Sequence, residues 1–440
     1  MAVDKETLPT APPSIVSAVE PELQFLWYKG PWPATLGAFR HRNFRLFWFG
    51  QLISLIGTWM QSVAQGWLIT ELVLQHYKTA NASAYLGVIG ALGSAPMLLF
   101  SLFAGAIADQ RDKRRILIAT QTSLMLLAFA LGLLVGTPLI RLWHIAVLAV
   151  LTGFVMAFDM PTRQAFVKDM VGREDLLNAI ALNSSVFNSA RIIGPAVAGW
   201  LIAFVSMRSV FLINAASYLA VIAGLILIRH KHIRPSSAGR NIFHHLREGF
   251  QFVAHHRTIR LLMMIMGVYS IFGFSYFVLM PVFARQVLGL QAKGYGVLIS
   301  STGIGPLAGA VLLAAMARRV RKGHALLAGG ITFSVGLMVF SQTRHFGLAV
   351  ALLPFVGGGL VVSSATINSL IQELSPDRLR GRVISIWTFI FAGFMPIGYL
   401  YSGWLAQQTS PSLAIFLGGL ACFLLVVFLS FRAPWVWREL

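Results

Sequence analysis

The stretch SLAIFLGGLACFLLVVFLSF, residues 412–431, contains no charged side chain. About 20 mostly apolar residues are what a helix needs to cross the hydrocarbon core of a bilayer. Hydrophobic residues make up 57% of the 440-residue chain and charged residues only 11%, whereas a soluble domain carries about 25% charged residues. The composition therefore excludes a soluble globular protein, and it excludes a disordered chain for the same reason.

Other apolar runs of similar length precede this stretch. The longest polar stretch between them divides the runs into six and six, so we predict an all-α membrane protein with two pseudo-symmetric six-helix bundles. The predicted spans are 46–70, 84–108, 116–138, 143–161, 178–204, 209–228, 261–283, 295–317, 325–342, 346–368, 383–406 and 412–431. The predicted organisation is an N-terminal tail (1–43), a first bundle (44–228), a central loop (229–260), a second bundle (261–431) and a C-terminal tail (432–440).

The basic residues lie almost entirely on one side of the predicted membrane. The net charge is +20, from 35 Lys+Arg against 15 Asp+Glu. When loops alternate between the two sides, 28 of the 35 basic residues fall on the side of both termini and 6 on the other. Cytoplasmic loops carry the excess of Lys and Arg, so both termini are predicted to be cytoplasmic. Because the charge is spread over segments between apolar spans, we expect a lipid bilayer and no nucleic acid as partner.

The second half of the sequence repeats features of the first. GPAVAGWL at 194–201 corresponds to GYLYSGWL at 398–405, and GSAP at 93–96 corresponds to GIGP at 303–306. The two offsets, 204 and 210 residues, place each match in the equivalent helix of the other half. Parallel repeats of this kind build transporters whose substrate site lies between the two halves.

The first predicted span carries polar side chains on one face. Steps of three and four residues, which mark one helix face, connect Gln51, Ser54, Thr58, Gln61 and Gln65. Against lipid, each amide would lose its hydrogen-bond partners, so this face must contact other helices or a water-filled cavity. We interpret it as the lining of a substrate cavity. The alternative is hydrogen bonding between packed helices.

Two pairs in the second half show the same helical spacing. Tyr269 and Tyr276 lie seven residues apart, and Ser364 and Asn368 lie four apart. Aromatic and amide groups on a cavity wall suit an amphiphilic organic substrate. For the tyrosines, the alternative is packing with the hydroxyl bonded to a neighbour.

Few charged residues lie inside or beside the spans. Arg191 lies deep in a span, where Arg costs at least about 2.5–3.5 kcal/mol. It either bonds carbonyls of neighbouring helices or serves substrate binding or coupling. Asp159 precedes Arg163 by four residues, an ion-pair spacing if the helix continues past Pro161. This pair is either structural or part of a proton relay. Glu71, at the outer end of the first span, completes the coupling candidates.

The sequence contains no motif of an ATPase or of a metal enzyme. Neither G-x-x-x-x-G-K-[ST] nor H-E-x-x-H occurs, so we expect no cofactor and an ion gradient as the energy source. The single cysteine, Cys422, rules out an intrachain disulfide. A histidine-rich segment in the central loop favours a basic amphipathic helix on the membrane surface, with a metal site as the alternative; its histidines are His230, His232, His244, His245, His255 and His256.

Two motifs resemble signatures of the major facilitator superfamily. GAIADQRDKRR at 105–115 is similar to the signature G-x-x-x-D-R-x-G-R-R/K, with Gln110 and Asp112 as departures. The resemblance implies a cytoplasmic gate made by Gly105, Asp109, Arg111, Lys113 and Arg114. The segment after Ile193 resembles the family's antiporter motif through Gly194, Pro195 and Gly199, although the second paired glycine is absent.

Three further segments resemble one branch of that superfamily. GTWMQ at 57–61, DMPTRQAF at 159–166 and RGRV at 380–383 are similar to the branch of enterobactin (siderophore) exporters and macrolide efflux proteins. The resemblance implies proton-driven export of a small organic molecule across a bacterial inner membrane, by a monomer and without enzymatic activity. Two alternatives stay open: an uptake or facilitative carrier for a metabolite, and a membrane-embedded enzyme or scaffold.

Overall fold

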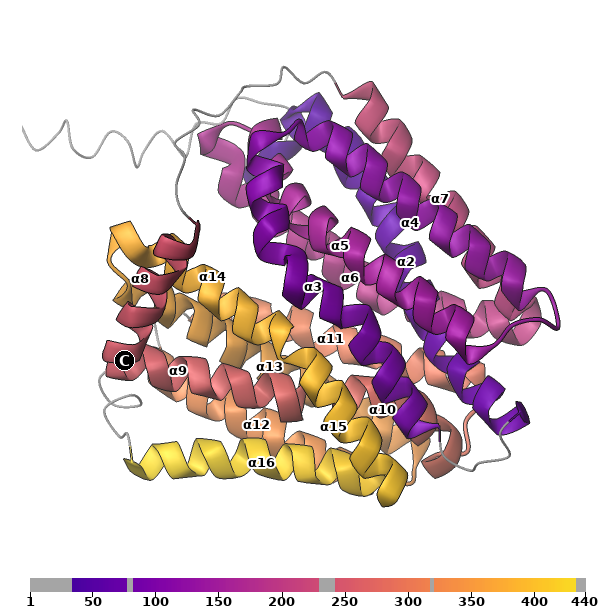
Figure 1. The fold of residues 1–440 in the computed structure, drawn as a ribbon. Helices are drawn as coiled ribbons and strands as arrows, with labels where there is room; N and C mark the ends of the chain where they lie inside the picture. Colours follow the sequence, from indigo (N-terminus) through magenta and orange to yellow (C-terminus); the bar gives the residue numbers. More distant parts are fainter. Residues whose placement is uncertain (1–33, 77–81, 229–241, 317–319, 433–440) are drawn as a thin grey trace, which may run out of the picture.

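The computed structural model describes residues 34–76, 82–228, 242–316 and 320–432, and these are helical with no strand among them (Figure 1). The first half consists of long, continuous helices. They are α2 (Arg42–His76), α3 (Ser83–Gln110), α4 (Lys113–Val135), α5 (Leu142–Met170), α6 (Leu176–Phe204) and α7 (Met207–Leu227). Two short 3-10 helices, η2 (Ala34–Arg40) and η3 (Arg173–Asp175), lie at the ends of this bundle.

The second half contains interrupted helices. The seventh span consists of α9 (Arg257–Val268), the π-helix η4 (Tyr269–Gly273), α10 (Tyr276–Val282) and the π-helix η5 (Phe283–Val287). The eleventh span is divided at Phe394 into α14 (Asp377–Gly393) and α15 (Met395–Gln408). The other spans of this half are α11 (Ala292–Met316), α12 (Lys322–Gln342), α13 (Phe346–Leu374) and α16 (Pro411–Arg432).

Among the described helices, eleven segments are long and apolar enough to cross a membrane. The 35-residue α2 is not one of these eleven, because its polar face lowers its mean hydropathy. Its length of about 52 Å at 1.5 Å per residue exceeds the thickness of a hydrocarbon core of about 30 Å. With α2, the described part of the chain contains twelve long helical segments, in agreement with the predicted fold class.

Two sequence-based boundaries were wrong. The predicted span 143–161 ends at Pro161, but α5 continues to Met170. Proline removes one backbone donor from a helix, and here the Thr162 hydroxyl donates to the Phe158 carbonyl at 2.7 Å, within the same turn. The predicted central loop 229–260 contains helix α8 (Ile242–His255) and the first turn of α9.

Helix α8 packs on the second bundle. Its Glu248 forms an ion pair with Arg382 of α14, and Val253 is buried while Phe250 is half exposed. The described part of the chain contains no group of three or more metal-ligating side chains. The side chains of His244 and His245, and all of His230 and His232, lie outside the described residues. A basic amphipathic helix at this position therefore agrees with the part that the structure describes.

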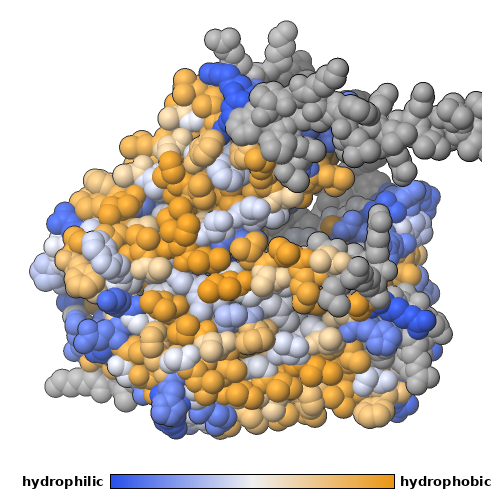
Figure 2. Space-filling model, turned by 180° about the vertical axis from the view of Figure 1, so that it is seen from behind, coloured by the Kyte–Doolittle hydropathy of each residue, from blue (hydrophilic) through white to orange (hydrophobic). Residues whose placement is uncertain are grey.

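The surface carries many exposed apolar side chains, as a lipid-facing protein requires. Phe355, Val311 and Phe428 are each more than half exposed. Figure 2 shows a broad hydrophobic surface, with hydrophilic residues gathered toward its edges. In water such a surface would drive aggregation, so the arrangement fits a protein that spans a bilayer.

Glycines allow the two bundles to meet closely. Gly199 of α6 faces Gly296 of α11, and a Cβ at Gly199 would lie 2.8 Å from the Ala292 carbonyl oxygen. Gly403 of α15 faces Gly87 of α3 in the same way, with a Cβ 2.8 Å from the Gly87 Cα. Gly199 and Gly403 are equivalent positions of the sequence repeat, so the repeat marks two equivalent contacts between the halves.

These contacts lie away from the end that carries α8. Figure 1 shows that the two bundles meet near α10 and the start of α3 and diverge toward α8. Other pairs of glycines serve packing within a bundle: Gly132 faces Leu212 of α7, and Gly358 faces Gly305 of α11. The glycine pair at 132 and 136 is therefore used inside the chain.

Candidate functional site: a cavity between the two bundles

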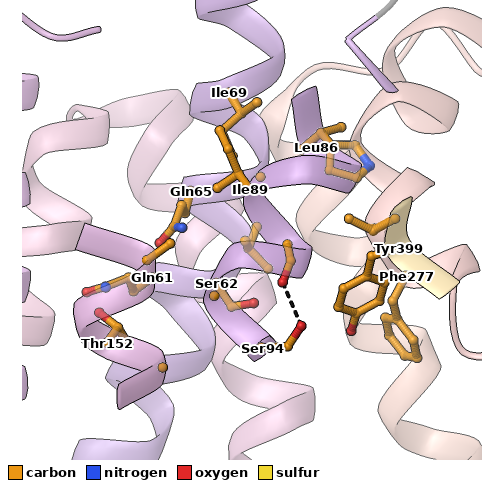
Figure 3. A pocket seen from close by; sticks show the side chains of 18 of the residues that line it. Gln61, Ser62, Gln65, Ile69, Leu86, Ile89, Ser94, Thr152, Phe277 and Tyr399 are labelled. Atoms are coloured by element: carbon orange, nitrogen blue, oxygen red, sulfur yellow. Dashed lines mark hydrogen bonds between the residues drawn. The ribbon is translucent and has the colours of Figure 1, made fainter. Parts of the chain in front are cut away.

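A cavity of about 530 Å³ lies between the two bundles (Figure 3). Helices α2, α3 and α5 of the first half and α10, α11 and α15 of the second half line it. This volume falls in the range of about 300–1,000 Å³ that is typical of small-molecule sites. A site at the junction of two repeats is where alternating-access transporters bind their substrates.

The first bundle supplies the polar groups of the cavity. They are Thr58, Gln61, Ser62, Gln65, Ser94 and Thr152. Figure 3 shows Gln61, Gln65 and Thr152 on the same side of the cavity. The Gln61 side-chain oxygen accepts from the Asn214 amide at 2.6 Å, which leaves its NH₂ group to donate. This wall therefore presents both donors and acceptors to a ligand.

The second bundle supplies an aromatic and aliphatic wall. Phe277, Val278 and Pro281 come from α10, Tyr295 from α11 and Tyr399 from α15. Figure 3 shows Phe277 and Tyr399 facing the polar wall from the other side. Trp59 also lines the cavity, and no charged side chain is among its described lining residues. The cavity therefore suits an amphiphilic molecule with an aromatic or aliphatic body.

Part of the predicted cavity face lies inside this cavity and part does not. Thr58, Gln61 and Gln65 line it. The helical spacing therefore selected one correct wall, but the pattern continues past the cavity. Gln51 and Ser54, one and two turns nearer the α8 end, are buried in the first bundle, and Gln51 accepts from Arg163 at 3.0 Å.

The predicted residues of the second half lie outside the cavity. Tyr269 is fully buried and its hydroxyl lies 3.4 Å from that of Ser363, as in the packing alternative. Tyr276 is also buried, with its hydroxyl unbonded among the described residues. Ser364 bonds a carbonyl of its own helix, and Asn368 accepts from Gln372. The helical period alone does not indicate which face of a buried helix meets the other bundle.

Several lining residues had no sequence signal of their own. Ser62 lies one residue off the polar face of α2, and Thr152 is a single hydroxyl in an apolar span. Tyr399 lies inside the repeated segment 398–405, and Ser94 lies inside the repeated segment 93–96. The repeat therefore marked both residues, since it marks the helix faces that meet between the bundles.

Asp159 lies at the centre of a buried polar cluster below the cavity. It is fully buried and forms an ion pair with Arg163. The Thr120 hydroxyl and the Gln121 amide of α4 donate to the same carboxylate oxygen at 2.8 and 2.7 Å. Arg163 also donates to Gln51 of α2. The cluster thus ties three helices together, and it realises the ion pair that the spacing predicted.

Arg191 has a different environment. Its guanidinium carbon lies 5.6 Å from the centre of the Trp59 ring and 5.0 Å from that of Phe277. Its Nε is buried without a hydrogen-bond partner, and the described residues give it neither an ion pair nor a carbonyl acceptor. Cation–π contacts contribute about 0.5–2 kcal/mol, which is less than the cost of about 2.5–3.5 kcal/mol of an Arg at the bilayer centre. Bonding to neighbouring carbonyls is therefore not the role of Arg191 in this conformation.

The residues of the signature loop act within the first bundle. Lys113 pairs with Asp169 of α5 at 2.7 Å, and Arg114 donates to the carbonyls of Leu225 and Ile226 at the end of α7. Asp112 caps α4 by accepting from the backbone of Arg114. Arg111 is exposed. The side chains of Gly105 and Asp109 lie outside the described residues. The implied gate between the bundles is therefore not formed by Lys113 and Arg114 in this conformation.

Glu71 links the two bundles at the end opposite α8. Its carboxylate lies 3.7 Å from Arg285 of η5, and Arg285 lies over the Trp67 ring. Trp67 in turn stacks on Tyr295 of the second bundle at 5.5 Å. These contacts close the cavity on this side, so Glu71 holds a position at the closed end and not at a proton path through the first bundle.

The fold and the cavity agree with what comparison shows. Residues 33–437 match the model of the transmembrane secretion effector family. The chain belongs to this family. It is therefore a transporter of the major facilitator superfamily and not an enzyme, so the alternative of a membrane-embedded enzyme was wrong.

The transporter is similar to three curated proteins over most of their length. It is 26% identical to the staphyloferrin A transporter of Staphylococcus aureus, over 81% of this chain and 87% of that protein. It is 26% identical to the multidrug efflux pump Tap of Mycolicibacterium fortuitum, with 82% and 88% covered. It is 22% identical to the macrolide efflux protein A of Streptococcus pyogenes, with 83% and 90% covered.

Solved structures share the fold at low sequence identity. A bacterial homologue of the lysosomal transporter Spinster, inward-facing and occupied, matches with a TM-score of 0.66 and 14% identity, over 89% of this chain and 95% of that one. A POT family transporter in complex with 5-aminolevulinic acid matches with a TM-score of 0.69 and 10% identity, over 90% and 97%. These likenesses show the fold alone.

Proposed function

We propose that this transporter exports a small amphiphilic organic molecule across the inner membrane of a bacterium, driven by the proton gradient. The observation that carries the proposal is the cavity between the bundles, with amide and hydroxyl groups on one wall and aromatic rings on the other. The names of the relatives, a siderophore transporter, a multidrug efflux pump and a macrolide efflux protein, support an organic cargo.

The distribution of charge supports the direction of export. If the basic α8 end is cytoplasmic, as the positive-inside rule requires, the contacts of Glu71, Trp67 and Gly199 close the side away from the cytoplasm. The cavity is then placed to receive its substrate from the cytoplasmic side. The monomeric state and the cytoplasmic position of both termini are parts of the same proposal.

Asp159 is our candidate for proton coupling. Among the described carboxylates it lies fully buried within a span, and Met156, one turn away on α5, lines the cavity. Arg163 and two donors stabilise its charged form, so it accepts a proton only when Arg163 moves away. Gln51, which already accepts from Arg163, offers that residue a second position.

Vesicle orientation tests the proposed direction. The cargo is first found by testing cells that lack the chain for sensitivity to a panel of drugs and siderophores. In inverted vesicles with an acidic interior, that compound is expected to accumulate, and dissipating the pH gradient is expected to abolish the accumulation. Proton-driven accumulation in right-side-out vesicles alone would instead support the uptake alternative.

Replacing Gln65 tests the cavity itself. Gln65→Leu removes an amide from the polar wall while keeping a similar size, and a neutral hydrogen bond contributes about 1 kcal/mol. We expect the KM of export to rise about fivefold with little change in protein level. Gln342→Leu is the matched control, because Gln342 is exposed at the end of α12 and lies outside the cavity. An equal effect of both variants would remove Gln65 from the binding site.

A further inference from the structure

The substrate cavity has a cation beside it and no anion. Trp59 and Phe277 both line the cavity, and both rings contact the guanidinium of Arg191. No carboxylate is among the described lining residues of the cavity. The remaining polar groups of the lining are amides and hydroxyls, which donate as readily as they accept.

The carboxylates of the described residues are all engaged with other bases. The ion pairs are Glu71 with Arg285, Asp112 with Arg115, Asp159 with Arg163, Asp169 with Lys113, Glu174 and Asp175 with Arg40, Glu248 with Arg382, Glu373 with Lys322, and Asp377 with Arg380. Arg191 has no part in these pairs. Its Nε is buried and makes no hydrogen bond within the described residues.

Arg191 also lies where the two bundles meet. It belongs to α6, its two aromatic neighbours belong to α2 and α10, and Gly303 of α11 packs against its Cγ, with a Cβ at 3.3 Å. A glycine at 303 leaves room for the Arg191 side chain at this junction. A ligand bound there would contact both halves at once, which is the position from which binding can bias an alternating-access equilibrium.

We propose that Arg191 binds an anionic group of the transported molecule, namely a carboxylate or a chemically equivalent sulfonate. This inference rests on the proposed function and narrows it to anionic amphiphiles. The anion supplies the charge partner that the fold withholds from Arg191, and the guanidinium binds it through charge-assisted hydrogen bonds. The aromatic wall holds the apolar body, and Gln61 and Gln65 bond the remaining polar groups.

Two dyes of similar size and opposite charge test the proposal. The full-length protein is placed in lipid nanodiscs, and binding of 5-carboxyfluorescein, an anion, and rhodamine 123, a cation, is measured by fluorescence anisotropy. We expect 5-carboxyfluorescein to bind at least tenfold more tightly than rhodamine 123. In Arg191→Gln this preference is expected to disappear, through a loss of at least tenfold for the anion alone, whereas Arg191→Lys retains most of it.

The outcomes separate a binding role from a structural one. Tighter binding of rhodamine 123 by the unmodified protein, no binding of 5-carboxyfluorescein, or an unchanged preference in a folded Arg191→Gln would each overturn the proposal. If Arg191→Gln does not fold, the charge preference of the unmodified protein and of Arg191→Lys decides. Binding of the dyes is measured without a proton gradient, so an absence of export in vesicles would reject the proposed function and leave this result standing.

Discussion

Asp159→Asn is expected to lower the melting temperature of the purified protein by on the order of 10 °C. Asparagine keeps an oxygen for Thr120 and Gln121 but leaves the Arg163 guanidinium, only 14% exposed, without its countercharge. Removing one partner of a buried ion pair costs about 3–5 kcal/mol, and each kcal/mol corresponds to roughly 2–4 °C in a domain of this size. The measurement is thermal unfolding in detergent, followed by tryptophan fluorescence.

The double variant is the matched control for this prediction. Asp159→Asn with Arg163→Gln removes both charges and leaves neutral amides to bond Thr120, Gln121 and Gln51. It is expected to recover most of the lost stability, because the pair and not the individual residue carries the cost. A double variant as unstable as Asp159→Asn alone would contradict this explanation. The folded double variant then tests coupling, since it is expected to transport without any dependence on the pH gradient.

Gly199→Val is expected to reduce transport more than tenfold while the protein still folds. The new side chain would meet the Ala292 carbonyl and Gly296 of the other bundle. Because this contact joins two bundles that separate during alternating access, the strain is relieved by opening the end of the molecule opposite α8. Gly153→Val serves as the control. Its side chain would meet Gly93 and Pro96 within the first bundle, so it is expected to destabilise the fold instead.

Cysteine labelling measures the predicted change of state. The single native cysteine, Cys422, is fully buried and provides a silent background. Gln65→Cys places a thiol on the cavity wall, and a membrane-impermeant reagent is added from the side opposite the cytoplasm. Labelling is expected to be at least tenfold faster when Gly199→Val is also present. Equal labelling rates would show that the glycine contact does not control the closed end.

The sequence predicted the architecture well because a bilayer imposes a strong and simple rule. Spanning helices must satisfy their backbone bonds internally, so apolar length and the charge of loops located nearly every helix. Interruptions were harder to predict. The continuation of α5 past Pro161 depends on the Thr162 hydroxyl, and the π-helices around α10 depend on packing, which no local pattern encodes.

The candidate site was predicted only on the helix whose two faces differ. Polar Gln61 and Gln65 stand out on α2 because its other face is apolar. On the spans of the second half, residues on all faces are apolar or aromatic, so Tyr269 and Tyr276 were chosen although Phe277 and Tyr399 line the cavity. Which side of such a helix meets the other bundle follows from close contacts such as Gly403 with Gly87.

The unpaired charge of Arg191 has an electrical consequence. A positive charge that moves through the whole membrane field changes its energy by about 2.3 kcal/mol per 100 mV. A cell interior that is electrically negative therefore favours the conformation in which the empty protein exposes Arg191 toward the cytoplasm. A bound carboxylate cancels that charge and makes the outward step independent of voltage. The membrane potential would thus return the empty carrier to the side where its cargo is waiting.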